Sequence, residues 1–129
     1  MVAIPKEVTD IMGGAVKVLV TVSAAGQPHA IVCGSILATG PDKVAVGEVL
    51  MKRAKENLAN GKASILVSAG PQSFELVLAN PKRYDAGPLF DNMKAGLAAH
   101  NLPCFAAWEF DVVEVWNESA GPGAGTKMA

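Results

Sequence analysis

The sequence predicts a mainly β domain with short helices, an α+β chain in which six strands form an antiparallel barrel. Several segments alternate with a period of two and are rich in β-branched residues, which is typical of strands. Short turns that contain Gly or Pro connect most of these segments. Half of the 129 residues are apolar and only 18% are charged, so we expect one folded domain over residues 1–129.

Three segments have the spacing of helices. Residues 1–14 contain a leading helix, because apolar residues recur at helical spacing after Pro5 and a pair of glycines follows. The segment from Leu50 to Asn60 repeats an apolar residue every four positions and ends at a glycine, which predicts an amphipathic helix. A third pattern, Asp85–Leu97, predicts a surface helix with a proline near its start.

The strands are expected between these helices, and hairpin turns join several of them. We expect Asn80-Pro81 to end the fifth strand. The six expected strands are Ala15–Ser23, Pro28–Leu37, Lys43–Gly47, Lys62–Ser68, Ser73–Ala79 and Phe105–Trp116. Connected in this way, they suggest a closed antiparallel barrel with helical additions.

Several of these strands are apolar on both faces. An isolated small barrel would expose one of those faces, so we expect a homodimer that covers it. The tail, Ser119–Ala129, is rich in Gly and Ala and has no periodicity. We expect the tail to be flexible or to contact the partner subunit.

Composition excludes several classes of function. The net charge of −1 argues against a nucleic-acid partner. No apolar run approaches the roughly 20 residues that span a bilayer, and no signal peptide is visible, so we expect a cytoplasmic protein without membrane contact. Two cysteines and two histidines form neither a disulfide framework nor a spaced zinc motif.

No familiar catalytic motif is present, and we assign no catalytic residue. The carboxylates Glu109 and Asp111 alternate with apolar residues on the last strand, so we interpret them as a solvated face. The entrance to the middle helix is more informative. It has no capping side chain, and Lys52 and Arg53 stand at the positive end of the helix dipole. A bound phosphate would explain both features, whereas the alternative is that the two cations point into water.

Three segments together resemble the FMN-binding split-barrel superfamily, the group of pyridoxamine 5′-phosphate oxidase and its small relatives. The segments are Thr21–His29, which is similar to the first hairpin of that family, Lys52–Asn60, which is similar to its basic helix entrance, and Ala106–Val113, which is similar to its closing strand. The resemblance covers about residues 15–116, and in size the chain is similar to small bacterial FMN-binding proteins. It implies a six-stranded antiparallel split β-barrel.

The resemblance also implies a site for FMN. The family's basic phosphate-binding residue corresponds to Arg53, with Lys52 as a second candidate, while Ala54 replaces a hydroxyl residue that is common there. The flavin ring would lie along two strand segments, Val32, Cys33, Gly34 and Ser35 in the second and Val46, Gly47, Glu48 and Val49 in the third. Small residues there would let backbone groups approach the ring, although Gly34 and Gly47 would equally suit bends of a barrel.

In relatives the partner subunit completes the pocket, and the flavin lies near the subunit interface. The resemblance therefore implies that Trp116 and the tail reach the neighbour's flavin. Trp116 can also be read as an ordinary core or interface aromatic residue. Asn57 is interpreted as a structural residue of the motif.

Two functions remain open. The first is a small FMN-dependent oxidoreductase or electron-transfer protein, in which the flavin carries the chemistry and the redox partner is not identified. The second is a non-catalytic protein on the same barrel that stores flavin or binds haem or a deazaflavin.

Overall fold

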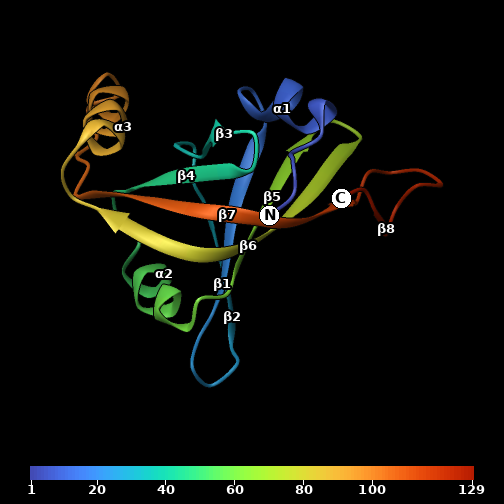
Figure 1. Cartoon of the computed structure of the whole chain (residues 1–129), viewed down its shortest axis with the longest axis horizontal. Helices are drawn as coiled ribbons and strands as arrows, with labels where there is room; N and C mark the ends of the chain where they lie inside the picture. The colour runs from blue at the N-terminus through green and yellow to red at the C-terminus, as the bar shows by residue number, and fades with distance from the viewer.

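The computed structural model describes all 129 residues, and its elements surround one strongly bent antiparallel sheet (Figure 1). The helices are α1 (Lys6–Met12), α2 (Lys52–Asn57), the 3-10 helix η1 (Leu58–Asn60) and α3 (Pro88–Ala98). The strands are β1 (Val16–Val22), β2 (Pro28–Val32), β3 (Leu37–Gly40), β4 (Lys43–Glu48), β5 (Ala63–Ala69), β6 (Gln72–Tyr84), β7 (Ala106–Asn117) and β8 (Thr126–Lys127). No helix is long and apolar enough to cross a bilayer.

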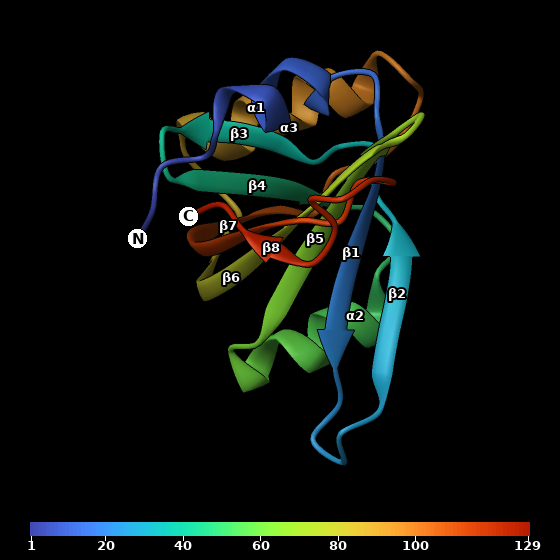
Figure 2. The ribbon, with the colours of Figure 1, turned by 90° about the vertical axis from the view of Figure 1, so that its right-hand side faces the viewer.

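The sheet is a split barrel rather than a closed one. Its strand order is β2-β1-β5-β6-β7-β4-β3, with β8 added beside β7, so β2 and β3 are unpaired edges. Figure 2 shows β3 and β4 running across the direction of β1 and β2. The expected antiparallel split barrel is confirmed, whereas the expectation of full closure is wrong.

The structure has eight strands where six were expected, because one predicted strand is divided and the tail adds another. The predicted strand Pro28–Leu37 is interrupted by a turn at Gly34-Ser35, in which the Ile36 amide donates to the Cys33 carbonyl at 3.4 Å. Glycine and serine are favoured in such turns. The turn carries the chain from β2, which pairs with β1, to β3, which pairs with β4.

Asn80-Pro81 does not end the fifth predicted strand. β6 continues to Tyr84 through a register shift between Ala79 and Lys82, where Asn80 adopts a positive φ of 53°. Proline is compatible with a strand at such a bulge, because no ladder hydrogen bond from its nitrogen is needed there. The Asn80 side chain also donates to the Asp111 carboxylate at 2.9 Å.

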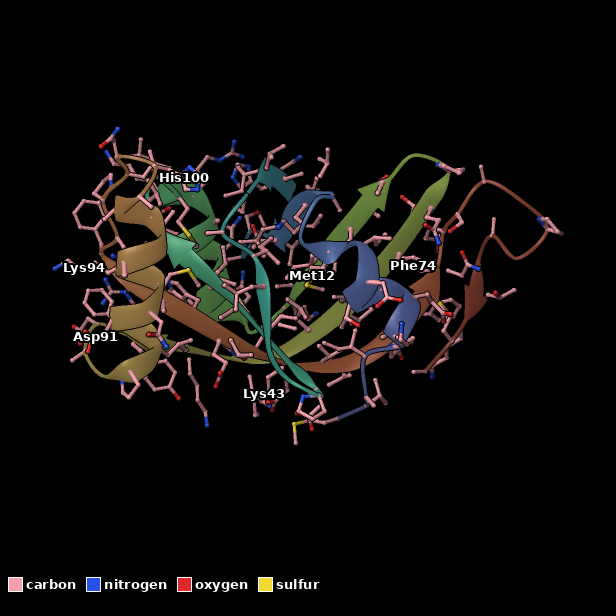
Figure 3. All side chains as sticks on the ribbon, turned by 90° about the horizontal axis from the view of Figure 1, so that it is seen from above. Met12, Lys43, Phe74, Asp91, Lys94 and His100 are labelled. Carbon is pink, nitrogen blue, oxygen red and sulfur yellow. The ribbon has the colours of Figure 1, made fainter.

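The hydrophobic core consists of two clusters, one covered by α1 and the other by α3. The main cluster fills the inside of the bent sheet and includes Val8 and Met12 of α1, which lies over β5 (Figure 3). A second cluster of five buried residues lies under α3 and joins Met93 and Leu97 to β4 and β7. Figures 1 and 2 place α2 at the other end of the molecule from α1 and α3.

The tail is not a free end in this structure. The amide of Met128 donates to the carbonyl of Val115 at 2.7 Å, and the amide of Val115 donates to the carbonyl of Ala129 at 3.0 Å. The Ser119 hydroxyl accepts from the amide of Ser73 at 2.9 Å. The chain after β7 therefore folds back on its own strand.

Candidate functional site

A cavity of about 930 Å³ lies where the β2–β3 turn, the β4–α2 connection and α3 meet. This volume is within the range of ligand-binding cavities, about 300–1,000 Å³. Eleven of its 19 lining residues are hydrophobic, and none is an aspartate or a glutamate. An apolar aromatic ring is therefore suited to this space.

Six of the predicted cofactor-binding residues come together in the wall of this cavity. They are Val32, Cys33, Gly34, Ser35, Gly47 and Val49. The first four form the end of β2 and the turn after it. The Ser35 hydroxyl accepts from the Gly47 amide at 3.0 Å and so joins the two predicted segments.

The remaining five predicted residues do not line the cavity, for reasons that differ. Val46 and Glu48 alternate with Gly47 on β4, so their side chains point to the opposite face. Val46 belongs to the main core cluster and is fully buried. Lys52, Arg53 and Trp116 lie outside the cavity wall.

Gly47 permits a close approach between β4 and α3. A Cβ atom on Gly47 would lie 2.6 Å from Cδ1 of Leu97 and 3.0 Å from Cγ of Met93. Both of those side chains line the cavity. The absence of a side chain at Gly47 therefore lets α3 pack close to β4 and form one wall of the cavity. The sequence predicted either a contact with the flavin ring or a barrel bend at this glycine, and neither interpretation includes packing against α3.

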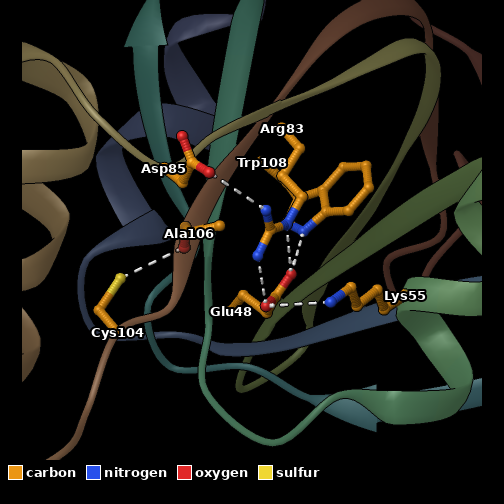
Figure 4. Close-up of polar contacts among 7 residues, drawn as sticks. All are labelled: Glu48, Lys55, Arg83, Asp85, Cys104, Ala106 and Trp108. Carbon is orange, nitrogen blue, oxygen red and sulfur yellow. Dashed lines mark hydrogen bonds and ion pairs between the residues drawn. The ribbon is translucent and has the colours of Figure 1, made fainter.

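Glu48 is the centre of a polar cluster on the other face of β4 (Figure 4). Its carboxylate accepts from Arg83 at 3.0 and 3.1 Å and from the Trp108 indole nitrogen at 2.9 Å, and Lys55 lies at 3.7 Å. The hydrogen bonds from Arg83 hold the pKa of Glu48 below its ordinary value. These contacts give Glu48 a structural role in this chain.

Lys52 and Arg53 are exposed in the first turn of α2 and make no ion pair or side-chain hydrogen bond. The absence of a capping side chain at the start of α2 is confirmed, since Met51 occupies the N-cap and caps nothing. Leu50 and Met51, directly before the two cations, line the cavity. In the sequence, the two cationic residues therefore come directly after two residues that line the cavity.

Trp116 does not line the cavity. Gly47 pairs with Ala107 on β7, and Trp116 follows nine residues later on the same strand. At about 3.3 Å per residue the separation along the strand is about 30 Å. The Trp116 indole donates to the Glu114 carboxylate at 2.9 Å, so it also has a local partner.

Three groups in the cavity wall were not assigned to the site from the sequence. They are Lys17 of β1, the α3 side chains Met93 and Leu97, and His100 after α3. Lys17 gives a readable signal, because it alternates with Leu19 and Thr21 on one face of a strand. The contribution of α3 depends on a packing arrangement that local periodicity does not reveal.

The Cys33 thiol in the cavity wall is not activated as a nucleophile. Burial raises the pKa of the Cys33 thiol to about 11, which keeps it protonated at neutral pH. No group of three or more His, Cys, Asp or Glu residues is placed to hold a metal ion.

The Asn57 side chain donates to the Thr21 hydroxyl at 3.1 Å, and both residues are buried. This contact ties α2 to β1 and agrees with a structural role for Asn57. Its partner is a side chain rather than the backbone.

Solved structures show the same fold as this chain. HupZ of Group A Streptococcus matches with a TM-score of 0.82 and 20% identity over 95% of this chain and 99% of its own. An FMN-binding protein from Syntrophomonas wolfei matches with a TM-score of 0.77 and 17% identity over 90% of this chain and 89% of its own. HutZ, the haem storage protein from Vibrio cholerae, matches with a TM-score of 0.65 and 15% identity over 92% of this chain and 97% of its own.

These likenesses establish the split-barrel fold of the chain. The proteins that share it are named for different ligands, FMN in one case and haem in another. No protein-family model and no curated protein matches the sequence.

Proposed function

We propose that this chain is an FMN-binding protein of the pyridoxamine 5′-phosphate oxidase-like superfamily, and that it works as a small oxidoreductase or electron-transfer protein. The cavity is the observation that carries this proposal. It is large enough for a ligand and largely apolar, and it lies in a fold shared with an FMN-binding protein.

The residues of the cavity fit a flavin. The turn at Gly34-Ser35 offers small residues to a planar ring, and Gly47 lets α3 close one side of the same space. Lys52 and Arg53 offer two unpaired cations to the phosphate. A bound flavin supplies hydride or one-electron chemistry, and the protein binds, orients and partly covers it.

A homodimer would complete this site. Four large apolar side chains that line the cavity are exposed: Val32, Leu37, Leu50 and Leu102. A second subunit would remove them from water, which favours association. We further propose that Trp116 and the tail of that subunit reach the flavin, because Trp116 does not line the cavity of its own chain and lies about 30 Å along β7 from the wall at Gly47. Both cysteines are free, which supports a cytoplasmic location.

Haem or deazaflavin binding without catalysis is the second candidate. Haem iron takes axial ligands such as His, Met or Cys, and His100, Met93 and Cys33 line the cavity. A protein that shares the fold is named as a haem storage protein.

A test of Lys52 and Arg53 as the phosphate site distinguishes FMN binding from a general affinity of the cavity for flat apolar molecules. The double variant Lys52→Met/Arg53→Met removes both cations without shortening the side chains much. Hydrogen bonds to charged groups contribute about 1.5–3 kcal/mol each, and both side chains are exposed, so we expect FMN affinity to fall about 100-fold.

Riboflavin, which lacks the phosphate, is the matched ligand and should lose almost nothing. The matched control variant is Lys62→Met/Lys82→Met, which makes the same charge change at exposed positions outside the cavity. Equal losses for FMN and riboflavin would reject the phosphate site.

A further inference from the structure

Lys17 is a charged residue on the inner face of the barrel. β1 alternates between a buried face, Lys17, Leu19 and Thr21, and a more exposed face. Lys17 is only 6% exposed, and it lines the cavity. Its neighbours on that face, Leu19 and Thr21, are 0% and 2% exposed.

Lys17 is the one side chain among the buried polar residues that makes no hydrogen bond or ion pair, and its ammonium nitrogen is not itself sealed from solvent, because no fully buried side-chain nitrogen or oxygen lacks a partner. Only four buried residues are polar or charged: Lys17, Thr21, Glu48 and Asn57. Thr21 and Asn57 bond each other, and Glu48 has Arg83, Trp108 and Lys55. The Lys17 ammonium makes no side-chain hydrogen bond and no ion pair.

Nothing in the cavity wall balances this charge. No lining residue is acidic, and the other titratable side chains there are Cys33 and His100. Burial lowers the pKa of Lys17, as expected for an ammonium without a counter-ion. The stem of Lys17 is therefore buried while its ammonium keeps contact with accessible space, and because Lys17 lines the cavity, an anionic group bound there is within its reach.

We propose that Lys17 binds an acidic oxygen of the ligand, so that the cavity selects an apolar or aromatic molecule that carries one anionic group. This rests on the proposed function only in that the cavity is the ligand site. The anionic group is distinct from a phosphate held at Lys52 and Arg53, which lie outside the cavity wall. Two sources of an oxygen acceptor are open to the ammonium: the carboxylate of a small molecule bound beside the flavin, which is anionic, and the carbonyl edge of the oxidised flavin ring, which is neutral and accepts only a hydrogen bond.

Two fluorescent probes with one skeleton test the charge preference directly. Anilinonaphthalene sulfonate carries one anionic group, and phenylnaphthylamine is its neutral counterpart. Both are titrated at pH 7 into the full-length wild-type chain and into Lys17→Met, Lys17→Arg and Lys82→Met. The last variant makes the same charge change at an exposed position on β6.

We expect Lys17→Met to weaken sulfonate binding about tenfold or more and to leave neutral-probe binding unchanged or tighter. Lys17→Arg should keep the preference for the sulfonate, and Lys82→Met should behave as wild type. Lys17→Met should leave the thermal midpoint of the ligand-free chain close to that of wild type, because methionine keeps most of the buried stem and the ammonium that it removes is not fully buried.

An unchanged ratio of sulfonate to neutral-probe affinity in Lys17→Met would overturn the inference while leaving the cavity as a binding site. If neither probe binds the wild-type chain, both the inference and the proposed function fail. A lower thermal midpoint in Lys17→Met, together with an unchanged ratio, would mean that the lysine stem only packs against the core.

The same titrations in the presence of FMN distinguish the two sources. If FMN excludes the sulfonate and Lys17→Met weakens riboflavin binding, the oxygen that Lys17 binds is the carbonyl edge of the flavin ring. If sulfonate binding persists beside FMN and still depends on Lys17, the group belongs to a second ligand. Both results support an anion site at Lys17.

Discussion

Replacing Glu48 with glutamine should destabilise the fold strongly, because its carboxylate joins three elements. It accepts two hydrogen bonds from Arg83 of β6 and one from Trp108 of β7, and Lys55 of α2 lies at 3.7 Å. Glutamine keeps the shape but loses the charge, and its amide group would face the guanidinium. The Trp108 indole can still donate to the remaining carbonyl oxygen.

The magnitude follows from how deeply each partner is buried. The Glu48 side chain is 7% exposed and that of Arg83 is 33% exposed. Removing one partner of a buried ion pair costs about 3–5 kcal/mol, and the partial exposure of Arg83 reduces this, so we expect a loss of about 2 kcal/mol for Glu48→Gln. Such a loss is large against a total stability of about 5–15 kcal/mol.

Urea unfolding at pH 7 measures this loss as a shift of the midpoint at constant slope. Asp85→Asn is the matched control, because Asp85 lies 3.8 Å from Arg83 but is 74% exposed, and it should change stability by less than about 0.5 kcal/mol. A loss for Glu48→Gln that is no larger than the loss for Asp85→Asn would refute the structural role of Glu48.

The lowered pKa of Glu48 also predicts how the stability difference between wild type and Glu48→Gln changes with pH. The pKa of Glu48 lies below its ordinary value of 4.5 in the folded state, so its contribution is complete above that value and is lost as the pH falls through the lowered pKa. The stability difference between wild type and Glu48→Gln should therefore shrink in acid. A difference that stays constant from pH 7 to well below pH 4 would contradict the assignment.

Three further predictions test the packing and assembly. Gly47→Val should destabilise the fold by about 1–3 kcal/mol in urea, because the added side chain meets Leu97 of α3; an unchanged midpoint would contradict the close contact. Light scattering at micromolar concentration should give twice the mass of the 13.3 kDa chain, and a monomer mass would reject the proposed dimer. Truncation after Trp116 should lower the thermal midpoint, because it removes the hydrogen bonds of Val115 with the last residues and the β7–β8 pairing. It should also reduce quenching of bound FMN if the tail reaches the partner's flavin.

The local parts of the fold were readable from the sequence because they depend on neighbours along the chain. The helices and most strand segments follow from apolar spacing and from the glycines that end them. The missed features depend on tertiary context. The Asn80-Pro81 pair reads as a strand end, yet a bulge and the bond to Asp111 carry β6 through it.

The site was readable only in part for the same reason. Six wall residues were predicted because they form two continuous segments that resemble a family's pattern. Glu48 as a cofactor contact stays a prediction, whereas its contact with Arg83, which lies 35 residues away in the sequence, was not readable from local pattern. Lys17 was overlooked because its face of β1, with Leu19 and Thr21, is the more polar one in sequence, so hydrophobicity alone favours the opposite, valine-rich face as the inner one although the structure buries the Lys17 face.

The absorbance spectrum of the full-length protein, taken after incubation with FMN and removal of free flavin, tests the proposed function most directly. We predict one FMN per chain, with a visible flavin band that dithionite bleaches and air restores. A chain that retains no flavin, or that shows a Soret band and binds haem in preference to FMN, would contradict the account.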